Sequence, residues 1–171
     1  MPGHRLDNGA LRRRCCFDPR ECTQYIARPV LLIYAIVWLG ILAVVKMKKR
    51  LLLVEDLPFD SELTLRAIGQ SGTPFEISLA RDGWDALVLM KNQDFDLILL
   101  DLKMPRMNGF ETMILKNGYG LQAGVPVIIL TNSNLEADRL EAQRLGAAGY
   151  LHKALDYAEF SDRLAATLRQ Y

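Results

Sequence analysis

The stretch that decides the fold of this chain is Leu97-Ile-Leu-Leu-Asp101-Leu-Lys-Met-Pro105-Arg-Met-Asn-Gly109. Four apolar residues lead to Asp101, and a turn built around Pro105 and Gly109 follows. A continuous apolar run is typical of a strand that is buried on both faces, as in a parallel sheet. The strand therefore presents the Asp101 carboxylate at its end, as a nucleophile or metal ligand. The simpler alternative is an aspartate that caps the next helix.

A second stretch of the same form lies upstream. Arg50-Leu-Leu-Leu-Val-Glu55-Asp56 is again an apolar run that ends in acids. If the two strands are parallel, they end at the same edge of the sheet, and the three carboxylates are expected to meet there. Ligands of open α/β sheets bind at this edge. Carboxylates gathered at one site raise one another's pKa unless a cation joins them, and Mg²⁺ suits an oxygen-rich cluster. The alternative is that Glu55 and Asp56 are ordinary acids at the N-terminus of a helix beginning near Pro58 or Asp60.

Two later strands end in other polar groups. Val127-Ile-Ile-Leu-Thr131 delivers a hydroxyl, and Gly149-Tyr150-Leu-His-Lys153 delivers an ammonium group. Taken singly, Thr131 is equally a helix N-cap, Lys153 a solvated lysine and Tyr150 a core aromatic. Acids, hydroxyl and lysine at successive strand ends together indicate a site for phosphoryl chemistry.

The region after Lys49 alternates between strand and helix patterns. Strands are predicted near 51–54, 75–79, 96–101, 126–131 and 148–152, each followed by a helical stretch. This alternation predicts an α/β fold, a doubly wound five-stranded parallel sheet with helices on both faces. Strand order 2-1-3-4-5 is expected, and it places the first and third strands, with their acids, side by side.

From about Lys48 to Tyr171 the chain resembles the receiver domain of a response regulator in two-component signalling, which has a flavodoxin-like fold. The resemblance rests on the order of an acidic pair, Asp101, Thr131 and Lys153. The end of the chain is similar to single-domain receivers that pair with phytochrome-like histidine kinases. We therefore expect residues 47–171 to form a receiver domain.

The resemblance implies a role for each of these residues. Asp101 is the phosphoacceptor, and a Mg²⁺ ion is bound directly by Asp56, through water by Glu55, and also by Asp101 and the Lys103 backbone carbonyl. The Thr131 hydroxyl moves toward the phosphoryl group, and the Lys153 ammonium group pairs with the phosphoryl oxygens. Tyr150 is the aromatic residue that turns inward on activation.

The resemblance also implies partners and a place of action. A histidine kinase donates the phosphoryl group, and the output is contact with a downstream protein target, a phosphotransfer protein or a second copy in a homodimer. Such a domain is not an ordinary enzyme, since it catalyses only transfer to its own aspartate and its own dephosphorylation. Its expected location is cytoplasmic. The formal net charge of +1 indicates no nucleic-acid partner.

Two other functions stay open. One is a phosphorylation-independent binding module on the receiver fold, because Asn132 stands where the family commonly has a small residue and Ala154 where it usually has proline. The other is a phosphatase of the haloacid dehalogenase type. It is disfavoured because such phosphatases have a second aspartate two residues after the nucleophile, where this chain has Lys103. The bulk of Asn132 is expected to alter dephosphorylation by restricting access to Asp101.

Residues 1–46 form a separate N-terminal extension. An apolar run at 29–45 is just long enough for a transmembrane helix that would make a membrane-anchored receiver, but basic residues flank it on both sides and define no orientation. We favour a mis-assigned start, with the natural one at Met47, and the third possibility is a soluble helix that packs on a partner. The cysteines Cys15, Cys16 and Cys22 lack the spacing of a zinc site.

Overall fold

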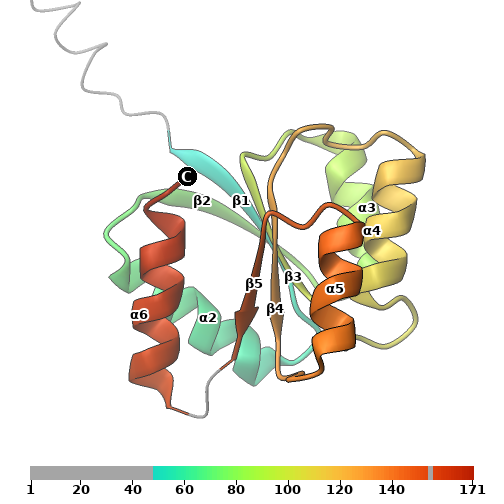
Figure 1. The fold of residues 1–171 in the computed structure, drawn as a ribbon. Helices are drawn as coiled ribbons and strands as arrows, with labels where there is room; N and C mark the ends of the chain where they lie inside the picture. The colour runs from blue at the N-terminus through green and yellow to red at the C-terminus, as the bar shows by residue number, and fades with distance from the viewer. Residues whose placement is uncertain (1–47, 154–155) are drawn as a thin grey trace, which may run out of the picture. The chain divides into compact units, whose positions relative to one another are not determined.

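The computed structural model describes residues 48–153 and 156–171. Within them, strands and helices alternate along the chain (Figure 1). The elements are β1 (Lys49–Val54), α2 (Pro58–Gln70), β2 (Phe75–Ala80), α3 (Gly83–Asn92), β3 (Leu97–Asp101), α4 (Gly109–Gly118), β4 (Val127–Thr131), α5 (Glu136–Arg144), β5 (Gly149–His152) and α6 (Tyr157–Leu168). The five predicted strands and the helix between each pair are confirmed.

The five strands form one parallel sheet in the order β2-β1-β3-β4-β5. This is the predicted order. Leu51 pairs with Leu97 and Val54 with Leu100, so β1 and β3 run side by side and end at the same edge. The acids that follow β1 therefore lie beside Asp101.

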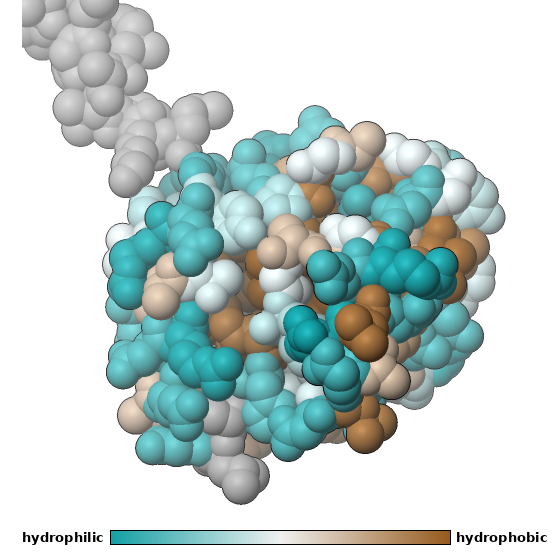
Figure 2. Space-filling view, in the orientation of Figure 1, coloured by the Kyte–Doolittle hydropathy of each residue, from teal (hydrophilic) through white to brown (hydrophobic). Residues whose placement is uncertain are grey.

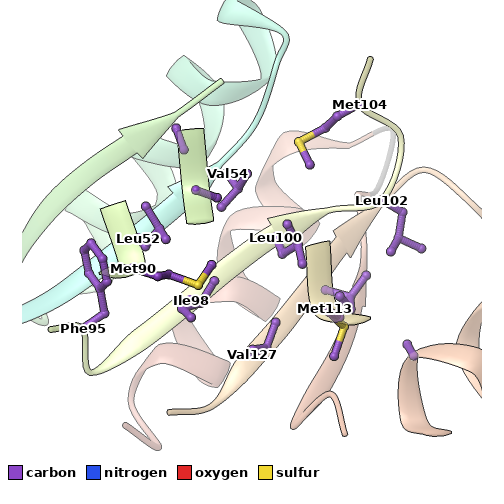
Figure 3. Close-up of a cluster of buried hydrophobic side chains, with 14 residues drawn as sticks. Leu52, Val54, Met90, Phe95, Ile98, Leu100, Leu102, Met104, Met113 and Val127 are labelled. Atoms are coloured by element: carbon purple, nitrogen blue, oxygen red, sulfur yellow. The ribbon is translucent and has the colours of Figure 1, made fainter. Parts of the chain in front are cut away.

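Helices cover both faces of the sheet. In Figure 1, α2 and α6 lie on one side, and α3, α4 and α5 lie on the other. Alternate residues of β1 point to opposite faces of the sheet. Leu51 and Leu53 pack with α2 and α6, whereas Leu52 and Val54 pack with α3, α4 and α5 (Figure 3). Because both faces of the central strands are buried, their sequences are apolar without alternation.

Helix α6 packs against the sheet through one stripe of apolar side chains. Phe160, Leu164 and Leu168 are buried in the layer that α6 shares with α2, whereas Arg163 and Arg169 are exposed. These residues recur at helical spacing and so share one face of the helix, and each fully buried leucine on it stabilises the fold by about 1.5 to 3 kcal/mol.

The surface over α5 is mostly hydrophilic. On the face seen in Figure 2, apolar residues there stand among hydrophilic neighbours. Leu135 and Leu140 are exposed, and the pairs Arg139–Glu136 and Arg144–Glu141 run along the helix.

No helix among residues 48–153 and 156–171 has the length and apolar character needed to cross a membrane. The 29–45 segment, the three cysteines and the proposed boundary at residue 46 lie outside the described residues, as does Ala154.

Candidate functional site

Three carboxylates meet at the carboxyl edge of the sheet. Glu55 and Asp56 directly follow β1, and Asp101 is the last residue of β3. One oxygen from each of the three lies within 4.8 Å of the others. Glu55 and Asp101 are buried, and Asp56 is half-buried. This is the cluster that the two apolar runs predicted.

None of these acids caps a helix. Helix α2 begins after Leu57 without a side-chain cap, and α4 is capped by Asn108 in a reciprocal pair with Glu111. The Asp101 Oδ1 atom instead accepts a hydrogen bond from the Leu102 backbone N–H at 2.8 Å. The helix-capping interpretation of Asp101 is therefore wrong.

Two buried oxygens of the cluster have no hydrogen-bond donor among the described residues, Glu55 Oε1 and Asp56 Oδ1. Burying a carboxylate oxygen without a partner is costly, and a hard divalent cation with oxygen ligands removes that cost. The donor set of Glu55, Asp56 and Asp101 thus fits Mg²⁺.

Lys153 is surrounded by acids. Its Nζ lies 2.5 Å from Glu55 Oε2, 3.2 Å from Asp60 Oδ2 and 3.6 Å from Asp101 Oδ2. Its backbone N–H donates to the Thr131 carbonyl at 2.8 Å, which holds the lysine beside the end of β4. Lys153 is buried and is not the solvated lysine of the alternative interpretation.

Burial and crowding of charge shift the pKa values of this site. Burial raises the pKa of Glu55 to about 7, although the neighbouring Lys153 charge opposes the shift. Burial also raises the pKa of Asp101, against the opposing effect of Lys153 and of the Lys103 and Leu102 backbone N–H groups. Burial lowers the pKa of Lys153, but the charges of Asp101 and Glu55 outweigh it, so the net shift is upward. The ammonium group therefore stays charged at neutral pH.

The hydroxyl predicted at the end of β4 belongs to a small network. Thr131 is buried, and its Oγ1 accepts from the Ser133 N–H at 3.1 Å. Tyr150 is half-buried and its hydroxyl donates to the Ser133 carbonyl at 3.2 Å. Ser133 Oγ in turn donates to Asp138 at 2.5 Å. Helix α5 begins after Leu135 without a side-chain cap, so the N-cap interpretation of Thr131 is wrong.

The loop after Asp101 is tightly closed. The Gly109 N–H donates to the Leu102 carbonyl at 3.1 Å, and a Cβ at position 109 would overlap the Asp101 carbonyl oxygen. Only glycine allows α4 to begin this close to the end of β3. The Lys103 side chain is exposed, and its backbone carbonyl stays a predicted metal ligand.

Sequence reasoning missed two residues of the site, Asp60 and Ser133. Asp60 was noted only as a helix-start residue, although it lies in the first turn of α2, four residues after Asp56, and so projects toward the same edge. Ser133 carried no signal of its own, because its contacts with Thr131, Tyr150 and Asp138 depend on the fold of the β4–α5 loop.

Comparison with known proteins agrees with this geometry. A family model described as the response regulator receiver domain matches residues 51–165. The chain belongs to the response regulator receiver family. Receiver domains are signalling proteins of two-component systems and not enzymes in the ordinary sense.

Individual relatives place the chain within this receiver family. The transcriptional regulatory protein CusR of Escherichia coli (strain K12) is 31% identical over 121 residues, which cover 71% of this chain and 52% of CusR. This receiver chain thus spans about half the length of that relative.

Two solved receiver structures are similar along most of their length. The phosphorylated cyanobacterial phytochrome response regulator RcpA is 28% identical, with a TM-score of 0.63 over 70% of this chain and 91% of RcpA. The Mn²⁺-bound response regulator Rcp1 is 30% identical, with a TM-score of 0.61 over 69% of this chain and 90% of Rcp1. The predicted resemblance to receivers and to phytochrome-associated regulators is confirmed.

Proposed function

We propose that this receiver accepts a phosphoryl group on Asp101 from the phosphohistidine of a histidine kinase and signals through contact with another protein. The observation that carries the proposal is the cluster of Glu55, Asp56 and Asp101, with two unpartnered buried oxygens, beside the Lys153 ammonium group. Acids and a buried lysine at one sheet edge provide both a nucleophile and the positive charge that phosphoryl transfer needs.

In the proposed step a carboxylate oxygen of Asp101 attacks phosphorus and the bond from phosphorus to the imidazole nitrogen breaks. The imidazole leaves with the electron pair of that bond and takes up a proton, and an acyl phosphate remains on Asp101. Lys153 lies 3.6 Å from Asp101 and is placed to neutralise charge on the transferred oxygens.

Glu55, Asp56, Asp101 and the Lys103 carbonyl are the groups that would hold Mg²⁺, with Glu55 acting through water. When bound, the ion supplies positive charge for the phosphoryl oxygens. The similar response regulator Rcp1 has been solved in a Mn²⁺-bound form, which supports divalent-cation binding by this chain.

The phosphorylated form then changes the network at the end of β4. An acyl phosphate adds roughly two negative charges and three acceptor oxygens, by analogy with phosphorylated hydroxyl residues. The Thr131 hydroxyl moves toward these oxygens and Tyr150 turns inward behind it. The receiving partner is a downstream protein, a phosphotransfer protein or a second copy of this chain. Because the donor is a kinase phosphohistidine, the place of action is the cytoplasm.

The test uses the full chain with acetyl phosphate and Mg²⁺, alongside Asp101→Asn, and intact mass as the readout. Wild type gains one phosphoryl group and Asp101→Asn gains none. Chelation of Mg²⁺ abolishes the gain. Calorimetric titration with Mg²⁺ gives binding to wild type and weaker binding to Asp101→Asn.

The alternative is a phosphorylation-independent module on the same fold. Asn132, which stands where the family commonly has a small residue, lines a small cavity of about 120 Å³ with Asp60, Lys153 and Tyr157. Wild-type protein that binds no Mg²⁺ and accepts no phosphoryl group from either acetyl phosphate or a phosphohistidine donor would favour this alternative.

A further inference from the structure

Asp82 is a buried carboxylate that the phosphoryl chemistry does not use. It is 0% exposed and precedes α3, where its Oδ1 caps the helix by accepting from the Asp85 N–H at 2.9 Å. Among the described residues, no uncharged donor reaches its other carboxylate oxygen, Oδ2. A helix cap needs only one of these oxygens, and asparagine or serine would serve equally well. A buried, ionised carboxylate is costly unless a cation lies beside it, so Asp82 needs a positively charged partner.

That cation is the guanidinium group of Arg106, whose Nη2 forms an ion pair with Asp82 Oδ2. Arg106 belongs to the loop between β3 and α4, three residues after Lys103. The backbone of Arg106 is left-handed, with φ of 64°. This conformation is unfavourable for a residue with a Cβ, so the surrounding contacts must hold it in place.

The two loops are also packed closely against each other. A Cβ at Gly83 would lie 2.6 Å from Met107 Cγ and would overlap the Thr112 hydroxyl. Gly83 and Met107 are both buried. The β2–α3 turn and the β3–α4 loop thus meet without space between them, and the Asp82–Arg106 pair joins them at the same place.

We propose that the Asp82–Arg106 pair is a positioning device that holds the β3–α4 loop, and with it the Lys103 carbonyl and Asp101, in the geometry that binds the divalent cation. The inference rests on the proposed function, since it assigns these residues to the metal site of the same receiver. Neither residue touches the reacting atoms. Their effect passes through the short chain from Arg106 back to Lys103 and Asp101, whose Oδ1 is itself held by the Leu102 N–H.

The test compares Asp82→Asn, Arg106→Gly and the double variant in the full chain. Asp82→Asn keeps a side-chain cap for α3 but removes the charge, and Arg106→Gly removes the cation while making the left-handed backbone favourable. We expect each single variant to bind Mg²⁺ about 10-fold more weakly by calorimetry, at the lower end of the range for loss of groups that orient metal ligands. Phosphoryl acceptance from acetyl phosphate at limiting Mg²⁺ slows in proportion, and saturating Mg²⁺ restores most of the rate.

The double variant separates coupling from two independent effects. Because the two residues act as one pair, the loss of Mg²⁺ affinity in the double variant is no larger than the larger of the two losses in the single variants. Glu141→Gln is the matched control, since it breaks a surface ion pair with Arg144 on α5, away from the three carboxylates, and leaves Mg²⁺ affinity unchanged.

Unchanged Mg²⁺ affinity in both single variants, with only a lower melting temperature, would overturn the inference and leave the pair a structural contact. Additive losses in the double variant would overturn it as well. Failure of wild type to bind Mg²⁺ is a different result, because it contradicts the proposed function itself.

Discussion

Lys153 is shared by three carboxylates, and this sharing makes Asp60 part of the site. The ammonium nitrogen lies closer to Glu55 and Asp60 than to Asp101. Glu55, Asp56 and Asp101 can share a metal ion, but Asp60 lies outside this group. When a cation binds Glu55, Asp60 therefore still competes with Asp101 for the Lys153 ammonium group.

Asp60→Asn is expected to raise the rate of phosphoryl acceptance from acetyl phosphate by about 2- to 5-fold. The Asp60 Oδ2 atom lies 3.2 Å from Lys153 Nζ, and without this ion pair the lysine turns more readily to Asp101. A 2- to 5-fold change in rate corresponds to about 0.4 to 1 kcal/mol. The rate is measured by intact mass against time at saturating Mg²⁺.

Glu62→Gln is the control for the loss of one negative charge from α2. Glu62 pairs with Arg66 on the exposed side of the helix and does not touch Lys153. Equal acceleration by both variants would assign the effect to net charge, and a slower Asp60→Asn would show that Asp60 orients the lysine for transfer.

At the scale of elements, the loop between α4 and β4 is tied to the end of α3 by one side chain. Gln122 Nε2 donates to the carbonyls of Met90 and Gln93 at 2.8 and 2.9 Å, and its Oε1 accepts from the Phe95 N–H at 3.0 Å. These contacts satisfy backbone groups at the C-terminus of α3 and at the approach to β3.

Gln122→Ala is expected to lower the free energy of unfolding by about 2 to 3 kcal/mol, because three buried or half-buried backbone groups lose their partner. Gln122 has φ of 50°, and alanine relieves none of that strain. Urea denaturation measures the change. The exposed Gln143→Ala on α5 serves as control and stays within about 0.5 kcal/mol of wild type. A loss of less than about 0.5 kcal/mol in Gln122→Ala would contradict this role.

Sequence patterns predicted the elements well because each element carries its own signal. The apolar runs of β1 and β3 are buried on both faces, and the stripe of α6 has helical spacing. They also predicted that Glu55, Asp56 and Asp101 meet, since parallel strands end at one edge.

Contacts made by loops could not be predicted in this way. The Asp82–Arg106 pair and the Gln122 hydrogen bonds join residues more than twenty positions apart, and no periodic pattern marks them. Asp60 was missed for a different reason, because an acid in the first turn of a helix already has an ordinary explanation.

For the whole molecule, the metal site makes stability depend on pH. Burial raises the pKa of Glu55 from 4.5 to about 7, so without a cation the folded state holds this proton more tightly than the unfolded state does. The raised pKa of Asp101 acts in the same direction. The resulting stabilisation is complete below about pH 4.5 and is lost as the pH rises through 7.

In a chelating buffer the free energy of unfolding is therefore expected to contain a decrease on the order of 1 to 2 kcal/mol between about pH 5.5 and 8. In Glu55→Gln the decrease is smaller, and added Mg²⁺ offsets it in wild type because the ion binds the ionised carboxylates of the folded state. Urea denaturation across this range measures the difference between the two proteins. Equal pH profiles for wild type and Glu55→Gln would contradict the assignment.

We expect the fold as a whole to present Asp101 for phosphorylation, and locating the phosphoryl group on the chain tests this expectation. The full chain is treated with Mg²⁺ and phosphoramidate, whose phosphorus–nitrogen bond resembles that of phosphohistidine, and the product is reduced with borohydride before peptide mass analysis. An acyl phosphate on Asp101 is reduced to homoserine, so we expect homoserine at position 101 of the wild type and an unmodified residue there in Asp101→Asn. Homoserine at Asp56 or Asp60, or at no acid in the chain, would contradict it.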